Sequence, residues 1–304
     1  MVTVESAGLT DVGRRREANE DRILLDDALG LYLVADGMGG HQAGEVASDL
    51  AVSSVHDFLS KHETSAPVAA ADHRSPSAAR LLAGIRWSNQ VVHQESLSRS
   101  DRQGMGSTLA AVYLAEDRLI AANIGDSPIY LVRNGGIDAL SVPHTLQAEI
   151  QSEACDPFFG NVLTRALGPK PAVDADLCEI DFYRNDLLLL CSDGLSNKVS
   201  PPEILSIVGV RPAREACRTL VEMANVRGGE DNISVIIVRI ADVRRNGHTL
   251  LGRWFNRLRA VLSEKKADDR PRGGWLGCAA VGRKGKSTSV LQSWRAHRIR
   301  FENT

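Results

Sequence analysis

The chain has 304 residues, 43% of them hydrophobic and 24% charged, which allows one large domain or two and is ample for a packed core. Its net charge of −2 divides unevenly, because residues 244–304 hold 15 Lys and Arg against 4 Asp and Glu (+11), whereas residues 1–243 hold 21 against 34 (−13). The acidic body is therefore a poor non-specific binder of nucleic acid, and the change of sign predicts a domain boundary at residue 243.

The five cysteines are odd in number and no two are close in sequence, so the pattern predicts neither a disulfide framework nor a zinc ribbon. The N-terminus lacks a basic region followed by an apolar stretch, and no apolar run approaches the length that a bilayer requires. We therefore expect a cytoplasmic protein in a reducing compartment.

The hydrophobic pattern predicts both strands and helices, in an order typical of layered α+β proteins. The expected strands are 31–35, 107–115, 118–124, 128–133, 137–141, 176–182, 186–192 and 233–240. The expected helices are 43–60, about 78–97, 201–208 and about 212–225, with a polar loop at 63–77. Strands that pair mainly with sequence neighbours, with helices in separate pairs, favour α+β layers over a parallel doubly wound sheet.

Four aspartates lie where an apolar run meets a turn that contains glycine. Such a run predicts a buried strand, so a carboxylate at its end is held on a rigid edge, and the glycine lets the backbone approach a ligand. One Asp-Gly pair is ordinarily just a turn. Four of them at strand ends indicate carboxylates that converge on hard cations, which prefer oxygen ligands. These residues are Asp36, Asp126, Asp193 and Asp231.

Seven short motifs occur in a fixed order across residues 5–240. They are Asp11-Val-Gly-Arg-Arg-Arg-Glu-Ala-Asn-Glu-Asp21, Ala35-Asp-Gly-Met-Gly-Gly-His41, Gly104-Met-Gly-Ser-Thr108, Ile124-Gly-Asp-Ser127, Asn161-Val-Leu-Thr-Arg-Ala-Leu-Gly168, Ser192-Asp-Gly-Leu195 and Gly229-Glu-Asp-Asn-Ile233. Each motif alone is weak, but the ordered set resembles that of the metal-dependent protein phosphatases, in their bacterial, phosphatase 2C-like branch. The resemblance implies a four-layer α/β/β/α sandwich of two mainly antiparallel sheets flanked by helix pairs, in a catalytic domain of residues 1–243.

The resemblance also implies a reaction: hydrolysis of phosphoserine and phosphothreonine in proteins by a hydroxide that bridges two metal ions, Mn²⁺ or Mg²⁺. A bridging pair of cations acidifies water and stabilises an in-line transition state. The positions that match the family's metal ligands are Glu20, Asp21, Asp36, Gly37, Asp126, Asp193 and Asp231. Among these, Asp36 resembles the bridging aspartate, with the Gly37 carbonyl as a second ligand, and Asp126 with Asp193 matches the position of a weaker third metal. Glu20 and Asp21 resemble the acidic pair that supports one of the two metals, directly or through waters.

Two further residues resemble the family's catalytic groups. Arg16 resembles the phosphate-binding arginine, whose planar fork suits a tetrahedral phosphate, whereas Arg14 and Arg15 have no such match and are expected to be solvated charges. His41 is the candidate to protonate the leaving alkoxide, because eukaryotic members carry a histidine directly after Asp-Gly, where this chain has Met38. The alternative for His41 is a hydrogen bond to a carboxylate that supports a metal ligand.

A second phosphatase chemistry is suggested by the run Cys178-Glu-Ile-Asp-Phe-Tyr-Arg184, which has the Cys-x5-Arg spacing of cysteine-dependent phosphatases. That chemistry requires a cradle of backbone N–H groups around a thiolate of depressed pKa. The intervening residues include two acids and no glycine and alternate like a strand, so we expect a strand here.

The chain departs from the family's pattern beside the expected site. Pro128 stands where the family commonly has arginine, and Pro143-His144-Thr145 replaces Asp-His-Ser, with a shorter segment after it. We expect His144, near a strand end, to be a surface or flap residue. No departure removes a metal ligand, whereas the alternative function, a non-catalytic phosphoprotein-binding regulator on this fold, would be expected to lose the metal aspartates.

The tail, residues 244–304, lies outside the motifs. Trp254, Phe255, Leu258 and Leu262 would form one apolar side of a short basic helix, and the Gly/Arg/Ser-rich remainder is typical of disordered chain. A solvated appendage is the first expectation, contact with an anionic membrane surface or an acidic partner is the second, and folding back onto the acidic body is the third. The other expected partners are phosphorylated protein substrates and a Ser/Thr kinase that opposes the phosphatase.

Overall fold

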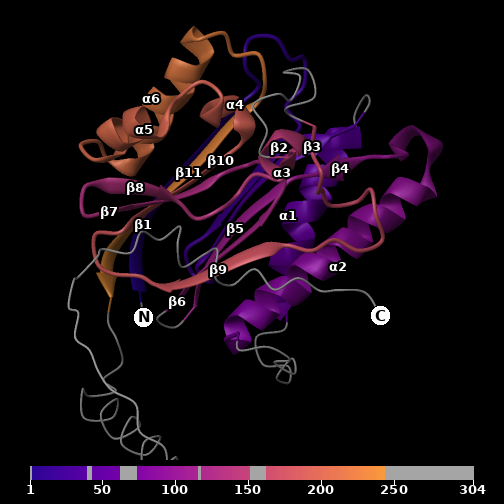
Figure 1. The fold of residues 1–304 in the computed structure, drawn as a ribbon, viewed down its shortest axis with the longest axis horizontal. Coiled ribbons are helices and arrows are strands. Elements are labelled where there is room, and N and C mark those ends of the chain that lie inside the picture. The colour runs from indigo at the N-terminus through magenta and orange to yellow at the C-terminus, as the bar shows by residue number, and fades with distance from the viewer. Residues whose placement is uncertain (1, 40–42, 62–73, 116–117, 151–161, 244–304) are drawn as a thin grey trace, which may run out of the picture.

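The computed structural model describes residues 2–39, 43–61, 74–115, 118–150 and 162–243. Two antiparallel sheets stack against each other, and helices cover the outer side of each sheet (Figure 1). The four-layer α/β/β/α sandwich expected from the sequence is therefore confirmed. The tail and His41 lie outside the described residues.

The strands form two sheets, in each of which neighbouring strands run antiparallel. The first sheet has the order β1-β11-β10-β7-β8, with bounds β1 Val2–Asp11, β7 Ile129–Arg133, β8 Gly136–Ala139, β10 Leu187–Cys191 and β11 Ile233–Val243. The second has the order β2-β3-β5-β6-β9, with bounds β2 Asp21–Asp26, β3 Leu31–Met38, β5 Leu109–Ala115, β6 Arg118–Ile124 and β9 Asp176–Asp181, and the short β4 Gly106–Ser107 pairs with β3.

The helices divide into two groups. Helices α1 (Ala43–Lys61) and α2 (Pro76–Ser98) cover the second sheet, and α4 (Asp193–Ser196), α5 (Pro201–Val208) and α6 (Ala213–Val226) cover the first. Two short elements, η1 (Ser100–Arg102) and α3 (Leu146–Ile150), lie in connections. Local sequence sets the starts of α2 and α5, because each has a proline in its first turn after a serine cap, and Ser200 and Glu203 form a capping box.

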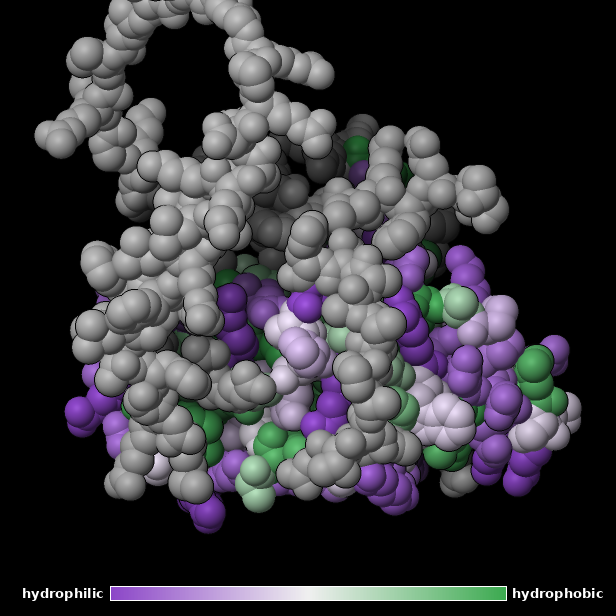
Figure 2. Space-filling view, turned by 90° about the horizontal axis from the view of Figure 1, so that it is seen from below, coloured by the Kyte–Doolittle hydropathy of each residue, from purple (hydrophilic) through white to green (hydrophobic). Residues whose placement is uncertain are grey.

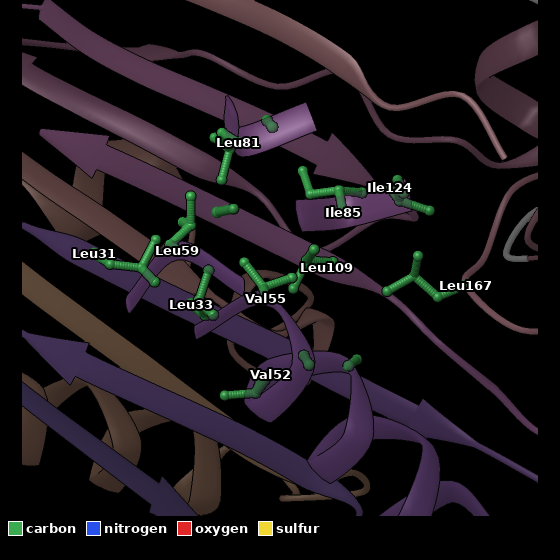
Figure 3. Packing of buried hydrophobic residues seen from close by; sticks show 14 of the residues in the cluster. Leu31, Leu33, Val52, Val55, Leu59, Leu81, Ile85, Leu109, Ile124 and Leu167 are labelled. Carbon is green, nitrogen blue, oxygen red and sulfur yellow. The ribbon is translucent and has the colours of Figure 1, made fainter. Parts of the chain in front are cut away.

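Alternation along the strands separates three layers of hydrophobic core. In β3, Leu31 and Leu33 face α1 and α2, whereas Tyr32 and Val34 face the other sheet, as the period of two in a strand requires. Figure 3 shows the first group meeting side chains of the two helices, among them Val55 of α1. Each fully buried aliphatic side chain stabilises the fold by about 1.5–3 kcal/mol, so the sandwich is a rigid support for its loops.

Three features of the strands differ from expectation. The strands β1 and β2 were not predicted, because β1 is an edge strand whose exposed positions are polar and β2 begins and ends on aspartates. Asp36 lies inside β3 rather than at its end. The strand continues through Gly37 because its partner changes from β5 to β4, with Gly37 opposite Ser107.

The described part of the chain contains no helix that is both long enough and apolar enough to cross a membrane. On the face in Figure 2, hydrophobic residues (green) are interspersed among hydrophilic ones (purple) where the described residues form the surface. Such mixing is ordinary for a protein surface.

Candidate metal-binding active site

The first two carboxylates are brought together by strand register. Asp21 of β2 lies directly opposite Asp36 of β3, and the Asp21 side chain is buried. The backbone of Asp36 is held on both sides by Thr108, whose Oγ1 accepts its N–H at 2.9 Å and whose own N–H donates to its carbonyl at 2.8 Å. The position of Asp36 is therefore fixed by the backbone, independently of any contact by its carboxylate.

The next two carboxylates come from turns of the first sheet. Asp193 opens α4 two residues after β10, and Asp231 stands two residues before β11, the neighbour of β10. A Cβ on Gly194 would lie 2.1 Å from the carbonyl oxygen of Asn232. Glycine is therefore required there for the two turns to touch, which brings Asp193 and Asp231 side by side.

A similar close approach makes room for Glu20. A Cβ on Gly37 would lie 2.6 Å from the Glu20 carbonyl oxygen, and one on Gly44 would lie within 2.8 Å of the Glu20 carboxylate. The Gly37 N–H donates to that carbonyl at 3.1 Å. Two glycines from β3 and α1 thus accommodate the segment that carries Glu20.

Two residues that the sequence analysis did not single out hold this arrangement. Asn232 donates from Nδ2 to the carbonyls of Val12 and Ala18, both at 2.9 Å, and its Oδ1 accepts the Glu20 N–H at 2.8 Å. Ser192 donates to Asp21 Oδ2 at 2.7 Å. Both directly adjoin a candidate metal aspartate within its motif, which is the only signal in the sequence that could have found them.

Burial and mutual repulsion raise the pKa values of these carboxylates. Burial is the main cause for Asp36, whose pKa lies well above its usual range, with Asp21 and Asp193 adding to it. The pKa of Asp21 rises to about 7 through burial, against hydrogen bonds that lower it. Burial and the charge of Asp193 raise the pKa of Asp126 to about 6. Crowded carboxylates with raised pKa values are a site where a cation is favoured.

The donor set fits a divalent cation. Every candidate ligand is an oxygen, as Mg²⁺ and Mn²⁺ prefer. The Oδ1 atoms of Asp21 and Asp193 are buried with no hydrogen-bond partner among the described residues. Within the described ranges, however, no group of three or more His, Cys, Asp or Glu side chains is arranged so that it could hold a metal ion. Asp231 is instead paired with Arg16, so metal binding requires side-chain adjustment there.

The structure brings Arg16 to the carboxylates. Its guanidinium, half-exposed, donates to Asp231 Oδ2 at 2.8 Å, and this bond is the main cause that raises the pKa of Arg16. The side chains of Arg14 and Arg15 are exposed. Arg14 is tied to the site only through its backbone N–H, which donates to the Gly229 carbonyl at 2.7 Å.

Two expectations about other residues are resolved by the structure. The prediction that His144 lies at the surface is wrong, because the residue is only 2% exposed. Cys178 lies within β9, and burial, together with Glu179, raises the pKa of its thiol to about 11. A thiol of raised pKa is a poor nucleophile, so the cysteine-phosphatase alternative has no support.

Comparisons with known proteins show the family of this chain. The family model for protein phosphatase 2C matches residues 13–242. The serine/threonine phosphatase stp of Listeria monocytogenes is 37% identical over 240 residues, 75% of this chain and 93% of that protein. The protein phosphatase PhpP of Streptococcus pneumoniae is 33% identical over 250 residues, 77% of this chain and 97% of that protein.

A solved structure gives the same result in three dimensions. The catalytic domain of the serine threonine protein phosphatase PstP, in complex with two manganese ions, superposes with a TM-score of 0.70 at 31% identity, covering 80% of this chain and all of that one. Both the sequence match and the shared fold extend over the described domain. The chain therefore belongs to the protein phosphatase 2C family, whose members in these comparisons are serine/threonine phosphatases.

Proposed function

We infer that the chain is a divalent-metal-dependent protein phosphatase that hydrolyses phosphoserine and phosphothreonine in proteins. The observation that carries this conclusion is the convergence of carboxylates from separate elements, namely β2, β3, the turn after β6, the start of α4 and the turn before β11, beside one arginine. When bound, a pair of divalent cations supplies acidified water and neutralises charge on the phosphate.

The residues of this chain have distinct proposed roles. The ligands of the cations would be Glu20, Asp21, Asp36, the Gly37 carbonyl, Asp193 and Asp231, with Asp126 at a weaker third position. Arg16 would hold the phosphate oxygens of the substrate and orient the ester for attack, supported by its place beside Asp231. Because Arg16 is half-exposed, its guanidinium is accessible to a substrate.

The leaving group of a serine or threonine ester is an alkoxide, which needs a proton. We propose His41 as the donor, on the resemblance of its motif. We also propose Mn²⁺ or Mg²⁺ as the ions, a cytoplasmic location, and a Ser/Thr kinase as the opposing enzyme. The two relatives described above, each named a phosphatase, support protein substrates.

The experiment compares wild type, Asp36→Asn and His41→Ala on a phosphoserine peptide and on nitrophenyl phosphate, with Mn²⁺ present. Asp36→Asn should lose about 10³-fold or more in kcat on both substrates, because the Asp36 carboxylate would be a ligand of the cations that supply acidified water. His41→Ala should slow the peptide far more than nitrophenyl phosphate, whose leaving group scarcely needs a proton. Activity of Asp36→Asn close to wild type would overturn the metal site, and equal losses for His41→Ala on both substrates would assign it a structural role.

A further inference from the structure

The turn that carries Asp126 is attached to one buried histidine. His144 donates its backbone N–H to the Gly125 carbonyl at 2.9 Å, and the Gly125 N–H donates back to His144 Nδ1 at 3.1 Å. One residue therefore satisfies both backbone polar groups of the residue that directly precedes Asp126. Because His144 is 2% exposed, water does not compete for these bonds.

These contacts fix the tautomer of the ring. A backbone N–H can only donate, so Nδ1 of His144 is unprotonated and the neutral ring carries its proton on Nε2. Nε2 lies 3.0 Å from Asp176 Oδ2, to which it donates. Arg165 lies 3.3 Å from Nε2 but is itself only a donor, so its productive bond is the one to Asp176 Oδ1 at 3.0 Å. Asp176 is thereby held by two donors and in turn orients the ring.

Neighbouring residues restrict the conformation of the turn at Gly125. Its φ is 95°, in the left-handed region, and a Cβ there would lie 2.6 Å from Cγ2 of Thr108, the residue that holds the Asp36 backbone. Asn123 Nδ2 adds a bond to the Gly125 carbonyl at 3.0 Å. Asn123 also lies opposite Asp176 in the β6–β9 pairing. The turn is therefore enclosed by Thr108, Asn123 and the segment that begins at His144.

We propose that His144, oriented by Asp176, is a positioning residue that holds the Gly125–Asp126 turn and so determines where the Asp126 carboxylate is presented. This inference rests on the proposed function only in taking Asp126 as a metal ligand. Residues that orient a ligand from outside the coordination shell typically change metal affinity by about 10–100-fold when they are replaced.

Two substitutions separate the two bonds of the ring. Asparagine places an amide oxygen near the position of Nδ1, so His144→Asn keeps an acceptor for the Gly125 N–H. Glutamine reaches the position of Nε2, so His144→Gln keeps a donor to Asp176 but loses that acceptor. His56→Asn is the matched control, since His56 Nε2 also lies 3.0 Å from a carboxylate, that of Asp26, between α1 and β2.

The first readout is amide hydrogen exchange at Gly125 and Asp126 by NMR in EDTA, in full-length proteins whose folding is checked by thermal unfolding. Exchange should be about tenfold faster in His144→Gln than in wild type and His56→Asn, with His144→Asn in between or near wild type. The second readout is Mn²⁺ binding by calorimetry, in which His144→Gln should weaken the weakest resolved site by about tenfold.

The proposal would be overturned if His144→Gln had the same amide exchange rates and the same Mn²⁺ affinity as wild type. It would also be overturned if His144→Asn and His144→Gln lost exchange protection and Mn²⁺ affinity to the same extent. The activity of the wild-type protein separates a failure of the proposed function from a failure of this inference. If wild type does not hydrolyse phosphopeptide with Mn²⁺, the function is wrong, while the exchange contrast still decides whether His144 holds the turn.

Discussion

At the scale of single residues, the site is held mainly through the backbone. Thr108 fixes Asp36 through its N–H and carbonyl, and Asn232 fixes the segment that carries Glu20 through three bonds. The Oδ1 atoms of Asp21 and Asp193 have no hydrogen-bond partner among the described residues and are available to a cation. Burial and mutual repulsion raise the pKa values of Asp21, Asp36 and Asp193, and Arg16 supplies a positive charge beside Asp231.

Arg16 and Arg14 provide a test of the phosphate contact. Arg16→Ala should lower kcat/KM on a phosphopeptide by about 10–100-fold, chiefly through KM, because a charge-assisted bond to phosphate is present before and during the reaction. Arg14→Ala removes the same charge from an exposed side chain and should change kcat/KM less than about twofold. Steady-state kinetics with Mn²⁺ decides the matter, and a larger effect for Arg14→Ala would move the phosphate contact to that residue.

Asp21 predicts a pH effect on stability when metal is removed. Its pKa is about 7 in the folded protein, against about 3.9 in an unfolded chain. Between about pH 4 and pH 7 the folded state therefore binds more protons, so the contribution of Asp21 to stability is full below that window and lost as the pH rises through it. In EDTA, urea unfolding at about pH 5 and about pH 8 should show a larger loss of free energy for wild type than for Asp21→Asn.

The comparison with Asp21→Asn removes the effect of other titrating groups. The substitution conserves the shape of the side chain and an oxygen that can accept from Ser192. If both proteins lose the same free energy between the two pH values, Asp21 does not carry the raised pKa. Its carboxylate would then be ionised throughout the window.

At the scale of elements, hydrophobic periodicity predicted the helices and strands whose position is determined by packing of an apolar face. The helices α1, α2, α5 and α6 and most of the strands lie within about two residues of their expected bounds, because each has a continuous apolar face. Periodicity did not find β1, an edge strand with polar outward positions, or the four-residue helix α4. Both depend on partners distant in sequence: β1 pairs with β11, and α4 packs against the turn that precedes β11.

The same limit applies to the candidate site. The candidate metal aspartates could be singled out from the sequence because each stands in a short motif that local sequence reveals. Asn232 and the buried His144 were not predicted, since their partners are up to 220 residues away or are backbone groups that carry no sequence signal. Contacts of this kind require the three-dimensional structure.

Asn232 links the two sheets at the site, and its loss should affect both stability and turnover. Asn232→Ala leaves the Glu20 N–H and two carbonyls without their partner, which should cost about 1–3 kcal/mol in free energy of unfolding. Turnover with Mn²⁺ should fall by about tenfold or more, because the segment carrying Arg16 and Glu20 is released. Urea unfolding and steady-state kinetics at a temperature where the variant is folded measure the two effects.

Asn89→Ala is the control for that variant. Asn89 is also buried and holds a loop by two bonds, to Lys170 and Gly168. Its replacement should lower stability to a similar degree while turnover stays within about twofold of wild type. Similar turnover losses in both variants would show that Asn232 acts through general stability.

At the scale of the whole molecule, the net charge of the chain changes sign where the described residues end. The last described residue, Val243 of β11, pairs with Val2, the first residue of β1. Residues 244–304, with their net charge of +11, follow β11 in the sequence and contain none of the candidate site residues. We propose that residues 1–243 are the catalytic domain and that the tail is a separate basic segment.

Deletion of residues 244–304 tests this division. Turnover of a phosphopeptide should stay within about twofold of the full chain, because the candidate site lies in the remaining domain. If the tail binds anionic lipid, the full chain should co-sediment with vesicles that contain phosphatidylserine at low salt, since each basic residue contributes about 1 kcal/mol. The deletion protein and neutral vesicles are the controls. Absence of sedimentation by the full chain would reject membrane binding, and an insoluble or inactive deletion protein would reject the domain boundary.

The dependence of turnover on metal tests the central claim most directly. Phosphate release from a phosphothreonine peptide is measured with full-length protein in EDTA, after addition of excess Mn²⁺ or Mg²⁺, and after treatment with a thiol alkylator in the presence of metal. We predict no detectable turnover in EDTA and recovery with either ion, because the carboxylates would bind the metal ions that the reaction needs. We predict little change on alkylation, because Cys178, Cys191 and Cys217 are buried. Full turnover in EDTA would contradict the metal site, and its loss on alkylation would transfer the chemistry to a cysteine.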